Sequence, residues 1–368
     1  MLFLFFASKI KIEHGRARIF ALPGKTGGKA GIVKKSSMAD VARLAGVSTA
    51  TVSHVINRSR FVSEEVTQQV EKAIRQLNYI PNQMARNLKT GRNHTVLFIV
   101  PDIANSFFAT AIEAVESVLV AAGYRLVIAN TKEDFAREAV HLQGAGNGTI
   151  DGLLLASTAG QWEQVAPLLP AGLPTVLVDR VFEHTGSSVS VDSAAALGQA
   201  VKALAAQGHA RIGFISGIAR LSSTKERLAA YRQAMAACGL PGGDGFVQTG
   251  DSMRGSSPQC CEKLLALGCT AIIVSNGVMA CDVAYYCMQR HTKAALVGYV
   301  DSPLQSRMAP YFASVFLPTE ELGRCAGQEI LRLMANPGAV PQAVRLPAQF
   351  RPSAQAGAAP CCKPEQEP

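Results

Sequence analysis

The sequence lacks the short motifs that usually reveal an enzyme. It has no G-x-S-x-G nucleophile elbow, no Rossmann glycine run and no cluster of metal-ligating residues. Its nine cysteines include no C-x-x-C pair, and an odd count without a convincing export signal suits reduced thiols in the cytoplasm. We therefore expect no catalysis, no cofactor and no metal.

A membrane-spanning segment is missing as well. The apolar run at residues 1–7 is far shorter than the roughly 20 residues that cross a bilayer, and no basic residue precedes it. We expect residues 1–37 to be a disordered extension, or translation from a start upstream of Val33 or Met38. The tail at 351–368, rich in Pro, Ala, Gln and Glu, is also expected to be disordered.

The most informative stretch is 38–57, MADVARLAGVSTATVSHVIN. Val41, Leu44 and Ala45 recur at helical spacing, Gly46 breaks the run, and Ser48 stands where an N-cap would open a second helix. Two short helices joined by a tight turn predict a helix-turn-helix, whose second helix can enter the major groove of DNA. A helical hairpin inside a core is the alternative. The second helix should bury Val52, Val55 and Ile56 and expose Thr49, Ala50, Ser53 and His54.

A third amphipathic helix is predicted over 62–77, with Ser63 as its N-cap and two glutamates in its first turn. The next helical pattern, 82–89, is too short to be stable alone in water, so it could fold only when DNA is bound. The predicted apolar side of the third helix consists of Val66, Val70, Ala73, Ile74 and Leu77.

Charge is distributed unevenly along the chain. Residues 1–95 hold 16 Lys/Arg against 5 Asp/Glu, a net charge of +11, whereas residues 96–368 hold 20 against 22, a net charge of −2. Without the extension, residues 38–95 still carry 8 Lys/Arg against 4 Asp/Glu, a net charge of +4. The excess of positive charge therefore lies with the predicted helix-turn-helix, as a polyanionic partner requires.

Residues 95–350 predict a separate α/β part. Apolar runs suited to buried parallel strands alternate with helical patterns, which predicts two doubly wound sheets with helices on both faces. Ligands of such folds lie beyond the carboxyl ends of the strands. The expected strands are 95–101, 124–130, 151–157, 211–216, 271–275 and 294–299.

The stretches at 39–65 and 77–91 resemble the DNA-binding end of the LacI/GalR family of transcriptional regulators, most closely that of the ribose and purine repressors. This resemblance implies a cytoplasmic repressor that binds a palindromic operator as a dimer. It further implies that a hinge helix enters the minor groove, where Leu88 wedges between bases beside Lys89. A packed position within the hinge is the alternative for Leu88. The implied DNA contacts are Ser48, Thr49, Ala50, Thr51, His54 and Arg60, together with Leu88 and Lys89.

The family resemblance continues along the chain in PDIANSFF, VDR, GHARIGFISG, ERLAAY, SN and ELG. It implies a periplasmic-binding-protein-like domain that binds a small-molecule effector, a sugar or related metabolite. The tail lacks the heptad leucines with which some relatives form tetramers, which favours a dimer. For Phe107 and Phe108 the alternative role is core packing, and for Arg227 the alternative is a surface ion pair. The implied effector contacts are Phe107, Phe108, Asp192, Ser223, Arg227, Asn276 and Asp301.

The sequence departs from the family pattern at the expected effector site. Val300 stands where relatives usually carry the first of two polar residues after VGY, so only Asp301 remains, and Gly277 replaces the usual Asp after SN. Three interpretations stay open: a less hydroxylated effector, a site that uses Asp301 instead, or a site that has lost its ligand.

The sequence thus predicts an all-α helix-turn-helix domain at 38–80, a hinge helix at 81–91 and an α/β effector and dimerisation domain of two subdomains at 92–350. Two other classes remain as alternatives. One is a small-molecule binding protein with an accessory helical domain, and the other is a nucleoid-type protein that binds DNA without sequence preference.

Overall fold

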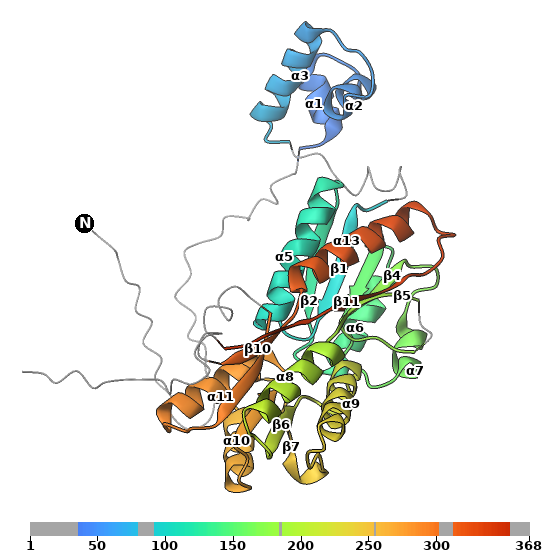
Figure 1. Cartoon of the computed structure of the whole chain (residues 1–368). Coiled ribbons are helices and arrows are strands. Elements are labelled where there is room, and N and C mark those ends of the chain that lie inside the picture. Colours follow the sequence, from blue (N-terminus) through green and yellow to red (C-terminus); the bar gives the residue numbers. More distant parts are fainter. Residues whose placement is uncertain (1–35, 80–91, 184–185, 254, 302–311, 354–368) are drawn as a thin grey trace, which may run out of the picture. The chain divides into compact units, whose positions relative to one another are not determined.

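The computed structural model describes residues 36–79, 92–183, 186–253, 255–301 and 312–353. The described residues belong to two compact units, one helical at 36–79 and one α/β at 92–353 (Figure 1). The hinge segment at 81–91 lies outside the described residues, as do most of the N-terminal extension and most of the tail.

The helical unit consists of three helices, α1 (Met38–Ala45), α2 (Thr49–Asn57) and α3 (Glu64–Gln76). Gly46 ends α1 with φ of +68°, a left-handed conformation that costs glycine little, and so allows the sharp turn into α2. This arrangement confirms the predicted helix-turn-helix. Of the apolar residues at helical spacing in α1, Val41 is buried and Leu44 is half-exposed, and Ala42 is buried as well. The core of the unit is made of Val41, Ala42, Val52, Val70, Ala73 and Tyr79.

Serine residues precede all three helices of this unit. Ser37 and Asp40 form a reciprocal capping box at α1, and the Ser48 hydroxyl accepts a hydrogen bond from the Thr51 backbone N–H at 3.1 Å. Ser63 occupies the expected N-cap position of α3, but its side chain makes no capping bond. Ser36 donates to the carbonyl of Leu77 at 2.8 Å. Ser36 and Ser37, which the sequence analysis assigned to the extension, therefore take part in the folded unit.

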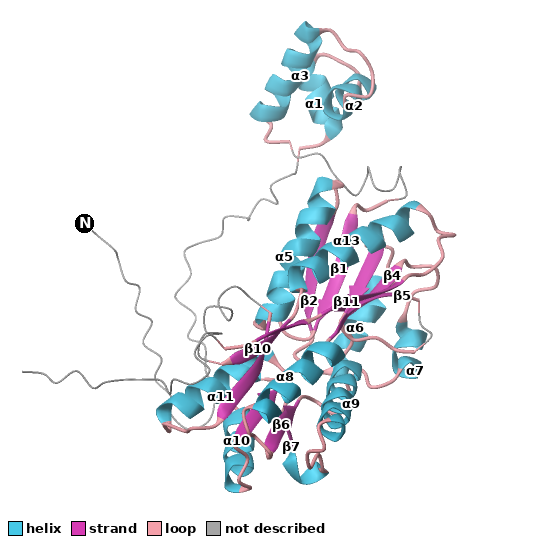
Figure 2. Cartoon of the chain, in the orientation of Figure 1, coloured by secondary structure: helices cyan, strands magenta, loops and turns pink. Residues whose placement is uncertain are grey.

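The α/β unit contains two six-stranded sheets, shown as magenta arrows in Figure 2. Their orders are β11-β5-β4-β3-β1-β2 and β12-β10-β9-β8-β6-β7, and all pairs are parallel except β10 with β12. The first sheet comprises β1 (Thr95–Val100), β2 (Arg125–Asn130), β3 (Gly152–Leu155), β4 (Thr175–Val178), β5 (Ser187–Asp192) and β11 (Ala343–Pro347). The second comprises β6 (Ile212–Ser216), β7 (Val247–Thr249), β8 (Ala271–Val274), β9 (Ala295–Val300), β10 (Ala313–Phe316) and β12 (Gln349–Arg351).

Each sheet and its helices form one subdomain, and the chain passes between the subdomains three times: after β5, after β10 and between β11 and β12. The first subdomain carries α5 (Ser106–Ala121), α6 (Phe135–Ala145), α7 (Trp162–Val165), the 3-10 turn η1 (Ala166–Leu168) and α13 (Thr319–Ala335). The second carries α8 (Ala194–Ala206), α9 (Ser222–Ala237), η2 (Asp244–Phe246), α10 (Ser257–Ala266) and α11 (Gly277–Gln289).

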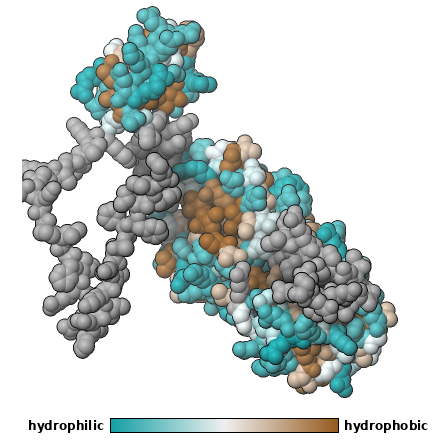
Figure 3. All heavy atoms as spheres, turned by 90° about the vertical axis from the view of Figure 1, so that its left-hand side faces the viewer, coloured by the Kyte–Doolittle hydropathy of each residue, from teal (hydrophilic) through white to brown (hydrophobic). Residues whose placement is uncertain are grey.

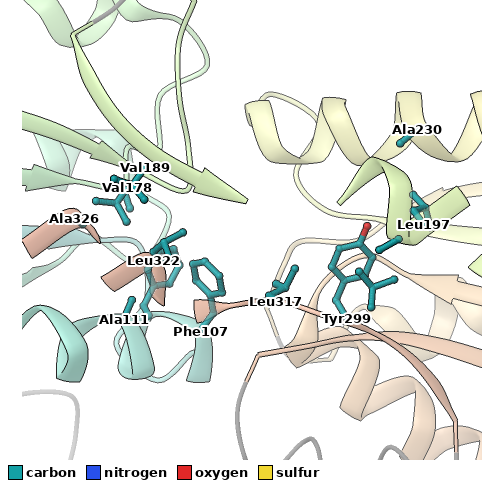
Figure 4. Packing of buried hydrophobic residues seen from close by; sticks show 14 of the residues in the cluster. Phe107, Ala111, Val178, Val189, Leu197, Ala230, Tyr299, Leu317, Leu322 and Ala326 are labelled. Carbon is teal, nitrogen blue, oxygen red and sulfur yellow. The ribbon is translucent and has the colours of Figure 1, made fainter. Parts of the chain in front are cut away.

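Alternate residues of the strands pack on opposite faces of each sheet, as the period of two requires. Phe98 and Leu154 contribute to the large core cluster that includes α5 and α13, whereas Leu97 and Leu153 belong to a separate cluster with α6 and α7. Helices on both faces confirm the doubly wound architecture. Figure 4 shows how the large cluster extends from Phe107 past Leu317 to Tyr299 in the second subdomain.

Helices α5 and α13 approach each other very closely. A methyl group added at Gly323 of α13 would lie 2.5 Å from the carbonyl oxygen of Ala111, and one at Gly327 would lie 3.0 Å from Val118. These glycines lie one helical turn apart, on the side of α13 that faces α5. The close approach therefore depends on the missing side chains.

Candidate DNA-binding surface and effector site

The second helix of the helix-turn-helix presents a polar surface. Ser48, Thr49 and Ala50 are exposed, and the hydroxyls of Ser48 and Thr51 are 2.9 Å apart. Because the Ser48 oxygen also caps α2, its lone pairs are partly occupied by the helix itself. His54 was expected to be exposed but is half-buried, and its Nδ1 lies 2.9 Å from the Ser59 hydroxyl. This contact fixes one ring nitrogen and leaves Nε2 as the atom for a base edge or phosphate.

The loop after α2 adds a cation and an aromatic ring. Arg60 is exposed, and the neighbouring Phe61 is 97% exposed, more than any other large apolar side chain among the described residues. Arg58 closes α2 with φ of +48°. Phe61 was not predicted as a site residue, because a phenylalanine between a serine-rich loop and a predicted helix gives no periodic signal. Leu88 and Lys89 lie outside the described residues.

The α/β unit holds a cavity between its two subdomains. Residues that follow strands line it, among them Asp179 after β4, Ser275 after β8 and Asp301 after β9, so it lies at the carboxyl ends of the strands. Its volume of about 40 Å³ has room for a few water molecules. Its lining consists of Asn105, Phe107, Phe108, Glu133, Asp179, Arg180, Gly217, Leu221, Ser223, Thr224, Arg227, Ser252, Ser275, Asn276, Gly277, Asp301 and Leu317.

Arg227 is held at the cavity by three neighbours. Its Nη1 donates to the carbonyl of Ser275 at 2.7 Å, its Nη2 is 3.8 Å from Asp179, and its guanidinium lies 4.7 Å from the centre of the Tyr299 ring. Burial raises the pKa of Asp179, and the positive charge of Arg227 opposes that rise. Asp179 also has φ of +63°, a conformation that is uncommon for a residue with a side chain. The guanidinium is therefore pre-oriented, with donors to spare.

A second charged pair closes the other side of the cavity. Arg180 and Glu133 form a two-pronged ion pair, with distances of 2.5 and 2.9 Å, and both side chains are about nine-tenths buried. The Nε atom of Arg180 has no hydrogen-bond partner among the described residues. Neither this pair nor Asp179 was predicted from the sequence. The signal was available in VDR, where polar residues directly follow a buried strand.

Asp301 lines the cavity and accepts a hydrogen bond from the Ser106 hydroxyl at 2.6 Å, across the two subdomains. Burial raises the pKa of Asp301 to about 6, although the Ser106 bond lowers it. Val300 lies in an apolar cluster with Ala284 and Phe312. Val300 therefore packs in the protein interior, and the carboxylate that lines the cavity is that of Asp301.

The remaining predicted effector residues divide into three groups. Phe107 and Phe108 line the cavity but are also buried in the large core cluster, so both roles are compatible. The Asn276 side chain accepts from the backbone N–H groups of Val278 and Met279, which makes it the N-cap of α11 as well as a lining residue. Asp192 does not line this cavity. It lies in an adjoining groove that Ser223 and Arg227 also line.

Arg220 links the two subdomains near the cavity. Its Nε donates to the carbonyl of Thr158 at 2.8 Å and its Nη2 to that of Glu133 at 3.1 Å. The Ser222 hydroxyl accepts from the backbone N–H of Val181 at 3.1 Å. These bonds cross the cleft and were not foreseen, because nothing in a sequence indicates which loops meet across two subdomains.

The helix-turn-helix and the two-subdomain α/β unit with its cleft define a DNA-binding regulator with a ligand-binding domain. Residues 37–82 match the model of the bacterial regulatory proteins of the lacI family, and residues 201–353 match the periplasmic binding protein-like domain. The ribose operon repressor of Escherichia coli (strain K12) is 34% identical over 320 residues, which are 84% of this chain and 97% of that protein. The chain belongs to the lacI family.

Other relatives agree with this assignment. The transcriptional repressor PurR of Photobacterium profundum is 31% identical over 299 residues, covering 79% of this chain and 90% of that protein. A crystal structure of the lac repressor dimer bound to operator and the anti-inducer ONPF shares the fold, with a TM-score of 0.76 at 22% identity over 86% of this chain and 98% of that one.

The chain is therefore a DNA-binding transcriptional regulator of the lacI family that carries a periplasmic-binding-protein-like domain. The resemblance and the fold class predicted from the sequence are confirmed. The binding protein with an accessory domain is not favoured. No helix among the described residues is long and apolar enough to span a membrane.

Proposed function

We propose that this regulator is a repressor, that it reads its operator with α2, and that it acts in the cytoplasm without catalysing a reaction. The observation that carries the proposal is the polar, accessible surface of α2 on a compact helix-turn-helix. Thr49 and Ala50 are exposed there, beside the hydroxyls of Ser48 and Thr51 and the ring of His54. Such groups pair with base edges and phosphates, and Arg60 adds a cation for the backbone.

Competition binding tests this reading of DNA. Fluorescence anisotropy with the full chain and an operator from its own promoter region, at one salt concentration, should show affinity about 10³-fold or more above that for random duplex. Equal affinity for both duplexes would support the nucleoid-type alternative and overturn the proposal.

We further propose that Leu88 is the minor-groove wedge and Lys89 its neighbour, in a hinge helix at 81–91 that joins domains at 38–80 and 92–350. Unstacking a base step costs a few kcal/mol, which the contacts of kinked DNA offset. Leu88→Ala should therefore weaken operator binding much more than random-duplex binding. A matched change, Leu77→Ala, removes an apolar side chain from the helical unit and should reduce both. Equal losses for Leu88→Ala would remove the wedge role.

For the effector, we propose a sugar or related metabolite that offers hydroxyl or anionic groups to Arg227 and a hydroxyl donor to Asp301. The planar fork of Arg227 and the unpartnered Nε of Arg180 supply donors, and Asp301 supplies the acceptor that residue 300 does not. Apolar surface comes from Phe107 and Phe108, and further polar atoms come from Ser223 and Asn276. Asp192 lies in the adjoining groove. A cavity of about 40 Å³ must widen to admit a sugar, so effector binding and cleft opening are coupled.

Thermal-shift screening of pentoses, hexoses, nucleobases and small acids against the full chain tests the effector site. One compound class should raise the melting temperature of the wild type, and Arg227→Ala should abolish the shift. Arg290→Ala is the matched control, because Arg290 lies at the C-cap of α11 and does not line the cavity. A shift that survives Arg227→Ala would place the ligand elsewhere.

The same chain presents an apolar surface suited to its second copy. Val120 at the end of α5 and Val127 and Ile128 on the edge strand β2 are 45 to 57% exposed. Figure 3 shows a brown area on the corresponding side of the α/β unit. Exposed apolar patches and open strand edges are typical of protein interfaces. We propose that this surface, the α5–β2 patch, belongs to the dimer interface.

A further inference from the structure

Two cysteines from neighbouring helices of the second subdomain face each other. The Sγ atoms of Cys261 in α10 and Cys287 in α11 lie 3.8 Å apart. A disulfide bond is about 2.05 Å long, so the gap to be closed is about 2 Å. Rotation of a cysteine side chain about its Cα–Cβ bond moves the sulfur by that amount.

The two thiols have different surroundings. Cys261 is fully buried in the apolar cluster that includes Leu264 and Val283, whereas Cys287 lies at the edge of that cluster and is partly exposed. An oxidant in solution can therefore reach Cys287 first, whereas the buried Cys261 can react only with Cys287. Exposure of one thiol beside a second, resolving thiol is typical of redox-sensing cysteines.

The hydrogen bond between the thiols strengthens this difference. Either sulfur can donate in this contact, and with the Cys261 thiol as the donor the bond lowers the pKa of Cys287 to about 7. The same hydrogen bond, together with burial, raises the pKa of Cys261. Because the thiolate is the nucleophile, Cys287 is the sulfur prepared to react at neutral pH.

We propose that Cys261 and Cys287 form a reversible disulfide when the protein meets hydrogen peroxide. The Cys287 thiolate attacks one oxygen of the peroxide. A sulfur–oxygen bond forms, the oxygen–oxygen bond breaks, and the departing hydroxide takes a proton to become water. The Cys261 sulfur then attacks the Cys287 sulfenic acid, the sulfur–sulfur bond forms, and the sulfur–oxygen bond breaks with release of a second water. Two thiols are oxidised, one peroxide is reduced, and a dithiol reductant reverses the change.

The position of the pair connects it to the effector site. Helix α11 begins at Gly277, and both Gly277 and the capping Asn276 line the cavity. A disulfide would fix α11 to α10 and so restrain the helix whose first turn forms part of the cavity wall. This consequence rests on the proposed effector site, whereas the bond itself does not.

Peptide mapping of the full chain tests the bond. The reduced protein is treated with hydrogen peroxide, blocked with N-ethylmaleimide, digested with trypsin and analysed by mass spectrometry. The expected product joins peptide 255–263, which holds Cys260 and Cys261, to peptide 264–290, which holds Cys269, Cys281 and Cys287. Cys287→Ser should lower the yield of this product at least tenfold, while Cys260→Ser and Cys281→Ser should leave it unchanged.

A second variant tests the order of the steps. In Cys261→Ser the Cys287 sulfenic acid has no partner, so dimedone should label Cys287 and the modified peptide should accumulate. Absence of the linked peptide from the wild type, or its persistence in Cys287→Ser, would overturn the proposal. A failure of effector binding in the thermal-shift screen would leave these results unaffected, so the two proposals can be distinguished.

Discussion

Individual side chains in this protein serve two demands at once. Asn276 caps α11 and lines the cavity, Ser48 caps α2 and lies on the proposed DNA surface, and Asp301 is buried between subdomains while facing the cavity. The two caps stabilise their helices, whereas a buried carboxylate has a cost in stability. The charged form of Asp301 shows this most clearly, because burial disfavours it.

The stability of the α/β unit should depend on the ionisation of Asp301. Its folded-state pKa of about 6 lies above the usual value of 3.8, so the folded state holds the proton more tightly than the unfolded state. The proton on Asp301 therefore contributes about 3 kcal/mol to the free energy of unfolding below about pH 4. This contribution is lost as the pH rises through about 6. Asp301→Asn keeps the neutral form and should remove this part of the decline. Urea unfolding of both proteins at pH 4.5 and 7.5 measures about 2 kcal/mol of this contribution, and equal pH dependences would contradict the assignment.

At the scale of elements, periodic and buried segments could be predicted from the sequence. The three helices of the small unit and the strands of 95–101, 211–216 and 271–275 have continuous apolar patterns, and the structure has them within two residues of the expected ends. The strand β5 was not predicted, because four of the six residues in its sequence SSVSVD are polar, although its first four residues are buried. The short edge strands β7 and β12 depend on sheet neighbours far away in sequence, which no local pattern reports.

The serine caps give a matched pair for testing local stability. Ser37→Ala removes the capping box of α1 and should lower the free energy of unfolding of the helical unit by about 1 kcal/mol. Ser63→Ala removes a hydroxyl that makes no capping bond and should change it by much less. Thermal unfolding followed by far-UV circular dichroism measures both. Equal losses would mean that the Ser63 hydroxyl caps α3 in solution.

The packing of α5 against α13 provides a second pair. Gly323→Ala places a methyl group 2.5 Å from the carbonyl oxygen of Ala111, so the helices must separate, at a cost of about 1 to 3 kcal/mol. Gly198→Ala in α8 meets no atom within 4 Å and should stabilise by up to about 1 kcal/mol through helix propensity. Denaturant titration distinguishes the two. A neutral Gly323→Ala would show that the close approach is not maintained in solution.

At the scale of the whole molecule, the class of protein was predictable and the details of its sites were not. The helix-turn-helix pattern and the uneven charge are local properties of the sequence. The ion pair of Arg180 with Glu133 and the bonds of Arg220 join residues 47 to 87 positions apart, and only the fold brings them together. The assignment to the lacI family is therefore confirmed, whereas the roles of individual residues in the DNA and effector sites remain predictions.

The dimer should depend on the α5–β2 patch. Val127→Asp places a charge on the edge strand, where burying it against a second copy is unfavourable, and should shift the dimer to monomers at micromolar concentration. Val340→Asp changes a valine that is 78% exposed outside this patch and should leave the dimer intact. Sedimentation velocity gives the answer. A Val127→Asp protein that remains dimeric would place the interface elsewhere.

Selection from random DNA measures whether α2 reads a specific DNA sequence. Rounds of binding by the full chain to a pool of random duplexes should yield a palindromic consensus. The same selection with His54→Ala should yield the palindrome with a weaker base preference at matching positions in both half-sites, because the His54 ring is the side chain of α2 best suited to a base edge. A pool that stays random after selection by the wild type would contradict the account.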